Sequence, residues 1–186
     1  AASDVYKRQG RCTRMLDKLC CSPEFLIATG RSINKERMKD QYVVLRAIAF
    51  LMLHRGEFKD IPALQYRGDI DDFLARFMVY VNDNAPEKLI VDYENLFIRC
   101  MQISYDLLGE NGFRFSGNGI RRPINMPLFE ALSYLFSFVP EKIDYTWASR
   151  LILDIESVKE EFDDSRYFSG NIDSVSYTHL TLPTKL

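Results

Sequence analysis

The strongest helical pattern of the chain is QYVVLRAIAFLMLHR, residues Gln41–Arg55. Its apolar residues recur at spacings of three and four, which predicts an α-helix. Further apolar residues at Val43, Ala47 and Phe50 widen the apolar stripe almost to the full circumference, as is typical of a buried helix. We therefore expect this helix at the centre of an all-helical domain, with Asp40 as its N-cap and Gly56 at its end.

Helical spacing continues on both sides of the central segment. We expect further helices over residues 11–21, 23–29, 70–82, 86–108, 127–139 and 142–162. Ser22-Pro23-Glu24 is a typical helix start, since a hydroxyl caps, proline suits the first position and an acid faces the positive helix end. Residues 111–125, NGFRFSGNGIRRPIN, are expected to be irregular. No window alternates as a half-buried strand does, so the sequence predicts an all-α, irregular bundle of six or seven helices.

The two ends of the chain share an unusual relation. Residues 1–9, AASDVYKRQ, can be back-translated to a DNA sequence whose reverse complement encodes VSYTHLTL, residues 175–182. One DNA sequence read in opposite directions thus accounts for both ends, which is typical of a sequencing adapter. We expect residues 1–9 and 175–186 to be adapter-derived, and residues 10–174 to be a helical domain truncated at both ends.

Charge is unevenly distributed along residues 10–174. This part carries a net charge of −4, but residues 10–55 carry +5 and residues 56–140 carry −4. A uniformly basic chain would indicate a nucleic-acid partner directly, whereas this chain is only locally basic. The longest apolar run, Ala47–Leu53, is too short to span a membrane, so no membrane partner is expected.

The residue types that catalysis and metal binding require are sparse. His54 is the only histidine outside the adapter-like ends, and no CxxC pair occurs among Cys12, Cys20, Cys21 and Cys100. We expect free buried thiols in a reducing, cytoplasmic environment, and no catalytic residue, metal site or cofactor in this part of the protein. The carboxylate clusters at residues 69–72, 160–161 and 163–164 lie where helix caps and solvated faces belong.

Four arginines are the candidate site residues. Arg37 lies in the basic stretch RSINKERMKDQYVVLR, and Arg114, Arg121 and Arg122 lie in the irregular stretch 111–125, which holds no acid. Guanidinium groups and free backbone amides suit phosphate, so these arginines are predicted contacts to the DNA backbone. The alternative is structural: such arginines reach across to helix ends and to carboxylates such as Asp40 or Glu130.

Four strings carry a resemblance to a known family. They are GRCTRMLDKLCCSPEFLIATG (10–30), INKERMKDQYVVLRAIAF (33–50), LGENGFRF (108–115) and RRPINMPLFEAL (121–132). In order and spacing they resemble the helical second half of the family named after the N-terminal domain of GmrSD-type restriction endonucleases, also called domain-of-unknown-function 262. The matching positions include Arg37, Met38 and Asp40 before the central helix, then Phe113-Arg114 and Asn125-x-x-Leu128-Phe129-Glu130.

The resemblance implies a parent protein with its chemistry elsewhere. In that family a ParB-like lobe with an Asp-Gly-Gln-Gln-Arg signature precedes the helical part, and it is associated with nucleotide-dependent DNA cleavage in defence against foreign DNA. The parent would then use a nucleoside triphosphate and a divalent metal, and the nuclease-like lobe would be the partner of the helical part. The signature does not occur in this sequence, so no catalytic residue carries over.

Three functions therefore remain open. The chain is interpreted as the non-catalytic helical part of a bacterial DNA-processing or anti-phage defence protein, supporting the lobe and contacting DNA. A helical protein-interaction module with no nucleic-acid role is the alternative, for which the net charge of −4 is the argument. A small free-standing helical enzyme ranks last, because no site supports it.

Overall fold

A computed structural model of the chain describes residues 10–33, 38–115, 121–140, 142 and 144–163. Within these residues the chain forms seven α-helices and no strand, so the predicted all-α, irregular bundle is confirmed. The helices are α2 (Arg11–Cys20), α3 (Pro23–Ala28), α4 (Lys39–His54), α5 (Ile70–Asp83), α6 (Glu87–Leu108), α7 (Met126–Phe136) and α8 (Tyr145–Asp163). Two short 3-10 helices, η2 (Pro62–Leu64) and η3 (Gly109–Asn111), lie in the connections.

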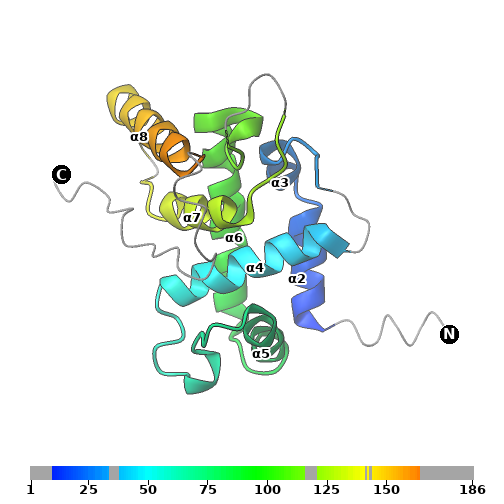
Figure 1. The fold of residues 1–186 in the computed structure, drawn as a ribbon. Helices are drawn as coiled ribbons and strands as arrows, with labels where there is room; N and C mark the ends of the chain where they lie inside the picture. Colours follow the sequence, from blue (N-terminus) through cyan, green and yellow to red (C-terminus); the bar gives the residue numbers. More distant parts are fainter. Residues whose placement is uncertain (1–9, 34–37, 116–120, 141, 143, 164–186) are drawn as a thin grey trace.

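Helix α4 is central, as its sequence predicts. It crosses in front of the long helix α6 and packs between α2 and α7 (Figure 1). Ten of its sixteen residues are buried, from Asp40 to Met52. Burial on nearly every side explains why the sequence of this helix lacks a polar face.

Side-chain caps set most of the helix starts. Ser22 accepts from the N–H of Phe25 at 3.4 Å, Asp69 from that of Asp72 at 3.0 Å, and Asn125 from that of Leu128 at 3.0 Å. Each bond satisfies an amide that has no partner within the helix. The cap predicted at Ser22 is confirmed, and within the carboxylate cluster at residues 69–72 the capping residue is Asp69.

The cap predicted at Asp40 is wrong. Helix α4 begins at Lys39, two residues before the predicted start at Gln41. Its N-cap is Met38, which has a left-handed backbone with φ 55°. Asp40 lies inside the first turn, 8% exposed, and its Oδ1 accepts from the N–H of Gln41 at 2.9 Å. The carboxylate therefore still faces the unpaired amides of the helix start, but from within the helix.

A cluster of four phenylalanines fills the core around Phe129. Phe129 on α7 is fully buried, and its ring centroid lies 4.3 Å from that of Phe113 and 6.4 Å from those of Phe25 and Phe97. These rings come from α3, α6, α7 and the segment after η3. The cluster thus ties the irregular segment to the helical core.

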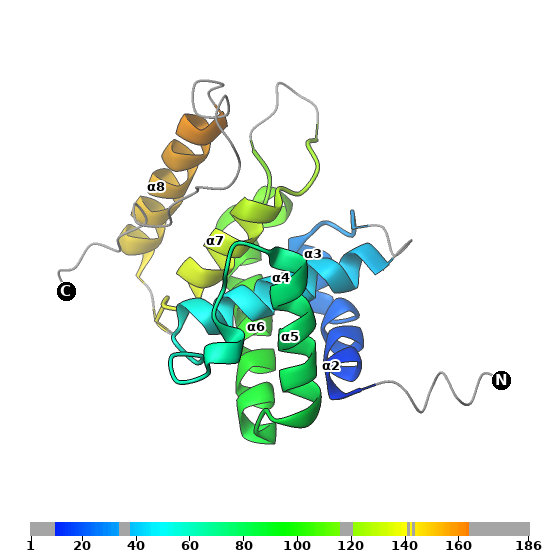
Figure 2. The same ribbon diagram turned by 60° about the horizontal axis from the view of Figure 1, so that its bottom comes forward.

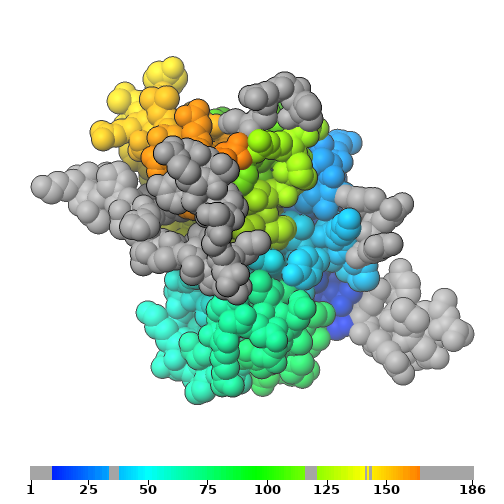
Figure 3. Space-filling view, viewed as in Figure 1, coloured from blue at the N-terminus to red at the C-terminus, as the bar shows by residue number. Residues whose placement is uncertain are grey.

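Helix α8 lies at one edge of the bundle and packs on it through Trp147, Leu151 and Ile155. Figures 1 and 2 show it at one edge, beside α6 and α7, while α5 lies at the opposite end of the view (Figure 3). Leu153 and Tyr145 of α8 are 70% and 87% exposed. The helix predicted over residues 142–162 is confirmed from Tyr145 onward. Asp144, directly before it, accepts a hydrogen bond from the N–H of Trp147 at 2.7 Å and so caps the helix.

Candidate functional site

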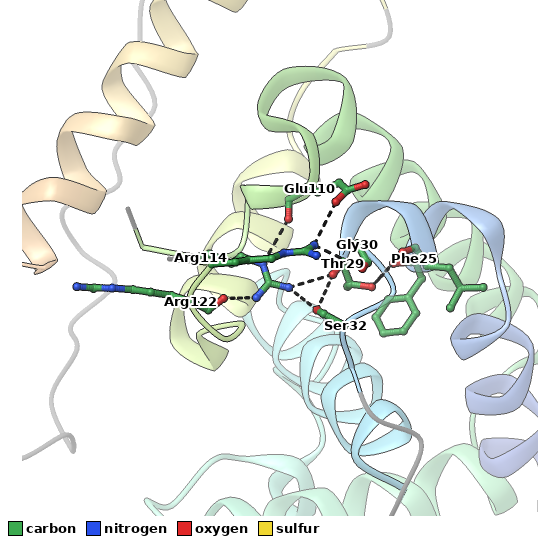
Figure 4. Close-up of polar contacts among 9 residues, drawn as sticks. Phe25, Thr29, Gly30, Ser32, Glu110, Arg114 and Arg122 are labelled. Atoms are coloured by element: carbon green, nitrogen blue, oxygen red, sulfur yellow. Dashed lines mark hydrogen bonds and ion pairs between the residues drawn. The ribbon is translucent and has the colours of Figure 1, made fainter. Parts of the chain in front are cut away.

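Arg114 is buried at the junction of α3 and the irregular segment (Figure 4). Its side chain reaches back to the end of α3, and only 4% of the residue is exposed. Nη2 donates to the carbonyl of Thr29 at 3.1 Å and to Oγ of Ser32, Nη1 donates to the carbonyl of Arg122, and Nε donates to the carbonyl of Glu110 at 3.4 Å. All three guanidinium nitrogens therefore have protein acceptors.

This placement favours the structural alternative for Arg114 over a contact to phosphate. The last carbonyls of a helix lack partners within the helix, and Arg114 supplies a donor to the one at Thr29, directly after α3. Burial lowers the pKa of Arg114, and the nearby Arg121 adds to that effect, yet an arginine stays protonated. With its nitrogens engaged and its surface covered, Arg114 has a structural role and is not placed to meet a phosphate.

The hydrogen bonds of Arg114 to Thr29, Ser32, Glu110 and Arg122 are called the Arg114 clamp. Arg121 and Arg122 lie at the surface, next to this clamp. Both side chains are 44% exposed. Arg121 pairs with Glu110 at 3.2 Å and also donates to the carbonyl of Gly30 at 3.4 Å, and Arg122 pairs with Asp163 at the end of α8. Exposed ion pairs of this kind contribute about 0–1 kcal/mol, so both guanidinium groups can exchange their carboxylates for another anion.

Gly30 lies where Arg121 crosses the end of α3, and its left-handed backbone, with φ +58°, favours glycine. A Cβ there would stand 1.7 Å from Nη2 of Arg121. Arg31 follows with φ 51° and is exposed. Arg121 reaches Gly30, next to the exposed Arg31, whereas the side chain of Arg122 points away from α3 toward Asp163 at the end of α8 (Figure 4). Arg31, Arg121 and Arg122 are together called the arginine rim, and Arg31 was not among the candidate residues of the sequence analysis. The fourth predicted contact, Arg37, lies outside the described residues.

Other arginines serve helix ends and carboxylates, as the structural alternative predicts. Arg55 donates to the carbonyl and to Oγ of Ser137 at 3.3 and 3.1 Å, and Arg99 donates to the carbonyl of Val139. Arg46 forms a buried ion pair with Glu130. Burial alone would lower the pKa of Arg46, but the Glu130 carboxylate outweighs it and the pKa is raised.

Among the described residues, no three His, Cys, Asp or Glu side chains could hold a metal ion, and no helix is long and apolar enough to cross a membrane. His54 ends α4 with its ring against those of Phe50 and Tyr134, at centroid distances of 6.0 and 5.4 Å. Desolvation by this packing lowers the pKa of His54, which fits a packing role at the helix end.

None of the four cysteines, all among the described residues, forms a disulfide; Cys12, Cys20 and Cys100 are buried, as predicted, and Cys21 is exposed. Burial raises the pKa of Cys12 and of Cys100 from 9.0 to about 12, although Arg99 and Arg55 partly oppose the effect at Cys100. Cys12 and Cys100 therefore stay protonated and unreactive at neutral pH.

The stability of the protein is expected to fall at alkaline pH because of these two thiols. Between pH 9 and 12 the folded state keeps both protons while the unfolded state loses them, so the free energy of unfolding decreases as pH rises. Each thiol contributes a slope of about 1.4 kcal/mol per pH unit. Urea titrations at several alkaline pH values measure the slope, and a Cys12→Ala/Cys100→Ala variant should show a flatter one. An equal slope in both proteins would contradict this role of the thiols.

Comparison of the chain with models of protein families, with curated proteins and with solved structures gave no match. The resemblance to the GmrSD-type family therefore rests on the quoted strings alone.

Proposed function

We propose that the chain is the helical, non-catalytic part of a bacterial, cytoplasmic DNA-processing or defence protein, and that Arg121 and Arg122 contact the DNA backbone. Its partner would be a nuclease-like lobe, which would hold the nucleoside triphosphate and the divalent metal. The observation that carries the DNA contact is the arginine rim, in which Arg31 and Arg121 lie at the end of α3 and Arg122 reaches the end of α8, beside the buried Arg114 that bonds the carbonyls of Thr29 and Arg122.

The chemistry of the rim fits phosphate. A guanidinium group binds phosphate through two parallel N–H bonds, which the flexible ammonium of lysine does not provide. The present partners of Arg121 and Arg122 are the exposed or half-buried carboxylates of Glu110 and Asp163, which a phosphate can replace. The rim carries no base-reading element, so binding independent of DNA sequence is expected.

Replacing both rim arginines is expected to weaken DNA binding and its dependence on salt. An Arg121→Ala/Arg122→Ala variant loses two phosphate contacts. The slope of log affinity against log salt, which is negative, should therefore become shallower by about 1.8. Fluorescence anisotropy with a duplex DNA of arbitrary sequence, titrated at several salt concentrations, measures this slope.

The matched control replaces two exposed arginines outside the rim, Arg67 on the connector between α4 and α5 (residues 55–69) and Arg150 on α8. The Arg67→Ala/Arg150→Ala variant removes the same net charge but should leave the slope close to that of the unmodified protein. Equal slopes for all three proteins, or equal losses for the two double variants, would refute the assignment of Arg121 and Arg122.

The second candidate is a protein-interaction module without a nucleic-acid role. The ion pairs of Arg121 with Glu110 and of Arg122 with Asp163 favour it, because they neutralise the rim within the chain itself. The net charge of −4 for residues 10–174 points the same way. No measurable DNA binding by the unmodified protein near physiological salt would select this candidate.

A further inference from the structure

An open apolar groove runs between η2 and α5, at the end of the molecule away from α8 (Figure 3). Its volume is about 560 Å³. One wall is formed by Ile61 and Leu64 of the connector, and the other by Ala75, Val79 and Tyr80 of α5. Val79 is 57% exposed and Ala75 is exposed as well, so the apolar surface is open to a partner.

Both walls of the groove are fixed by interactions within the chain. Arg76 of α5 donates to the carbonyls of Ala63 and Gln65 on the connector and pairs with Asp72 at 2.8 Å. Gln65 donates from Nε2 to the carbonyl of Phe58 at 2.6 Å. A groove held in this way exists before a partner arrives, which lowers the entropic cost of binding.

The lining of the groove is mainly apolar, and its charged group is already paired. The only charged side chain in its lining is Arg76, and its donors are taken by two carbonyls and a carboxylate. The remaining lining is mostly aliphatic and aromatic, and the ring of Tyr80 packs against that of Phe58 with a centroid distance of 5.7 Å. The groove therefore suits aliphatic side chains and offers no free cation for an anionic ligand.

The surface around the groove is acidic. Residues 57–84 contain six acidic and three basic residues, and one of the three bases is the Arg76 already paired with Asp72. Exposed acids stand at both ends of α5, with Asp69 and Asp71 at its start and Asp83 at its last position. A partner that fills the groove thus meets negative charge on either side.

We propose that this groove, called the α5 groove, docks a basic amphipathic segment of a partner protein. Aliphatic side chains of the segment fill the space beside Val79 and Leu64, and its lysines or arginines face the acids at the ends of α5. Spacing of apolar residues by three and four would place them in the groove as one helical face. This inference does not rest on DNA binding, because the α5 groove and the arginine rim use different residues.

Three synthetic peptides of about 18 residues, long enough for about five helical turns, test the proposal on the full chain. One has an apolar leucine face and a lysine face, the second replaces lysine with glutamate, and the third replaces leucine with serine but keeps the lysines. Fluorescence anisotropy should show binding of the leucine–lysine peptide and at least about tenfold weaker binding of the other two, a difference of about 1.4 kcal/mol.

Variants locate the binding. Ala75→Phe should block the groove and Val79→Ser should make it polar, and each is expected to weaken binding of the leucine–lysine peptide at least about fivefold, equivalent to about 1 kcal/mol. Both positions are exposed, so the fold should tolerate the changes, which circular dichroism checks. The control is Val91→Ser on α6, an exposed valine at 40% that lies outside the groove lining, and it should bind as the unmodified protein does.

Several outcomes would overturn the proposal. Equal binding of the glutamate peptide would remove the role of charge, and equal binding of the serine peptide would reduce the effect to electrostatics alone. Unchanged binding by Ala75→Phe and Val79→Ser, or loss of the same size in Val91→Ser, would place the peptide elsewhere. Absence of binding by all three peptides would show that the α5 groove does not accept such segments.

Discussion

Replacing Phe129 with alanine is expected to lower the free energy of unfolding by about 4 kcal/mol, within the range for a buried phenylalanine. Phe129 is fully buried, and its ring meets those of Phe25, Phe97 and Phe113. The truncation therefore leaves a cavity where α3, α6, α7 and the segment after η3 converge, and none of these elements can close it alone. Urea unfolding followed by circular dichroism measures the loss.

The control for this prediction is Tyr145→Ala. It removes an aromatic ring of similar size from a residue that is 87% exposed on α8, and its effect should stay within about 0.5 kcal/mol. A loss below about 1 kcal/mol for Phe129→Ala would mean that the phenylalanine cluster does not hold the core together.

Replacing Arg114 with alanine is expected to cost about 3 kcal/mol. The substitution removes the donors to Thr29, Ser32 and Arg122, so that the carbonyl of Thr29 keeps only the hydroxyl of Ser32 and the carbonyl of Arg122 loses its guanidinium partner. A hydrogen bond to a charged group contributes about 1.5–3 kcal/mol, and a buried group left unsatisfied costs about 1–3 kcal/mol. The same urea titrations measure this variant.

Two further variants distinguish the loss of the Arg114 hydrogen bonds from the loss of a positive charge. Arg114→Lys keeps the charge but lacks the planar fork, so it should recover only a small part of the stability. Arg121→Ala removes an exposed neighbour and should cost less than about 1 kcal/mol. If Arg114→Ala were as mild as Arg121→Ala, the clamp would not be a determinant of the fold.

The helices could be predicted from local patterns, but the partners of the arginines could not. Ser22 and Asp69 cap the helices that follow them within three residues, so a short window of sequence contains all the information needed. Arg114 and Thr29, in contrast, are 85 residues apart, and Arg46 and Glu130 are 84 apart. Local spacing carries no signal for such pairs, so exposed and buried arginines look alike in the sequence.

The start of α4 shows a limit of the local patterns as well. Aspartate before an apolar helical run is a strong cap signal, yet Asp40 is buried inside the first turn. The left-handed backbone at Met38, which methionine rarely adopts, carries no sequence signature.

The described positions that carry the family resemblance have structural tasks. Asn125 caps α7, Phe113 and Phe129 fill the core, Glu130 pairs with Arg46, and Arg114 holds the end of α3. These roles in the fold account for the residues without any catalytic chemistry, so the resemblance by itself carries no activity over to this chain.

The Arg114 clamp also has a consequence for the order of folding. It joins two segments that are distant along the chain, and the entropy of closing such a loop must be lost before the contact stabilises anything. We therefore expect the clamp to close after the rate-limiting step, once α3 has packed on α6. In kinetic terms Arg114 should have a low φ-value, so that its loss speeds unfolding and leaves the refolding rate nearly unchanged.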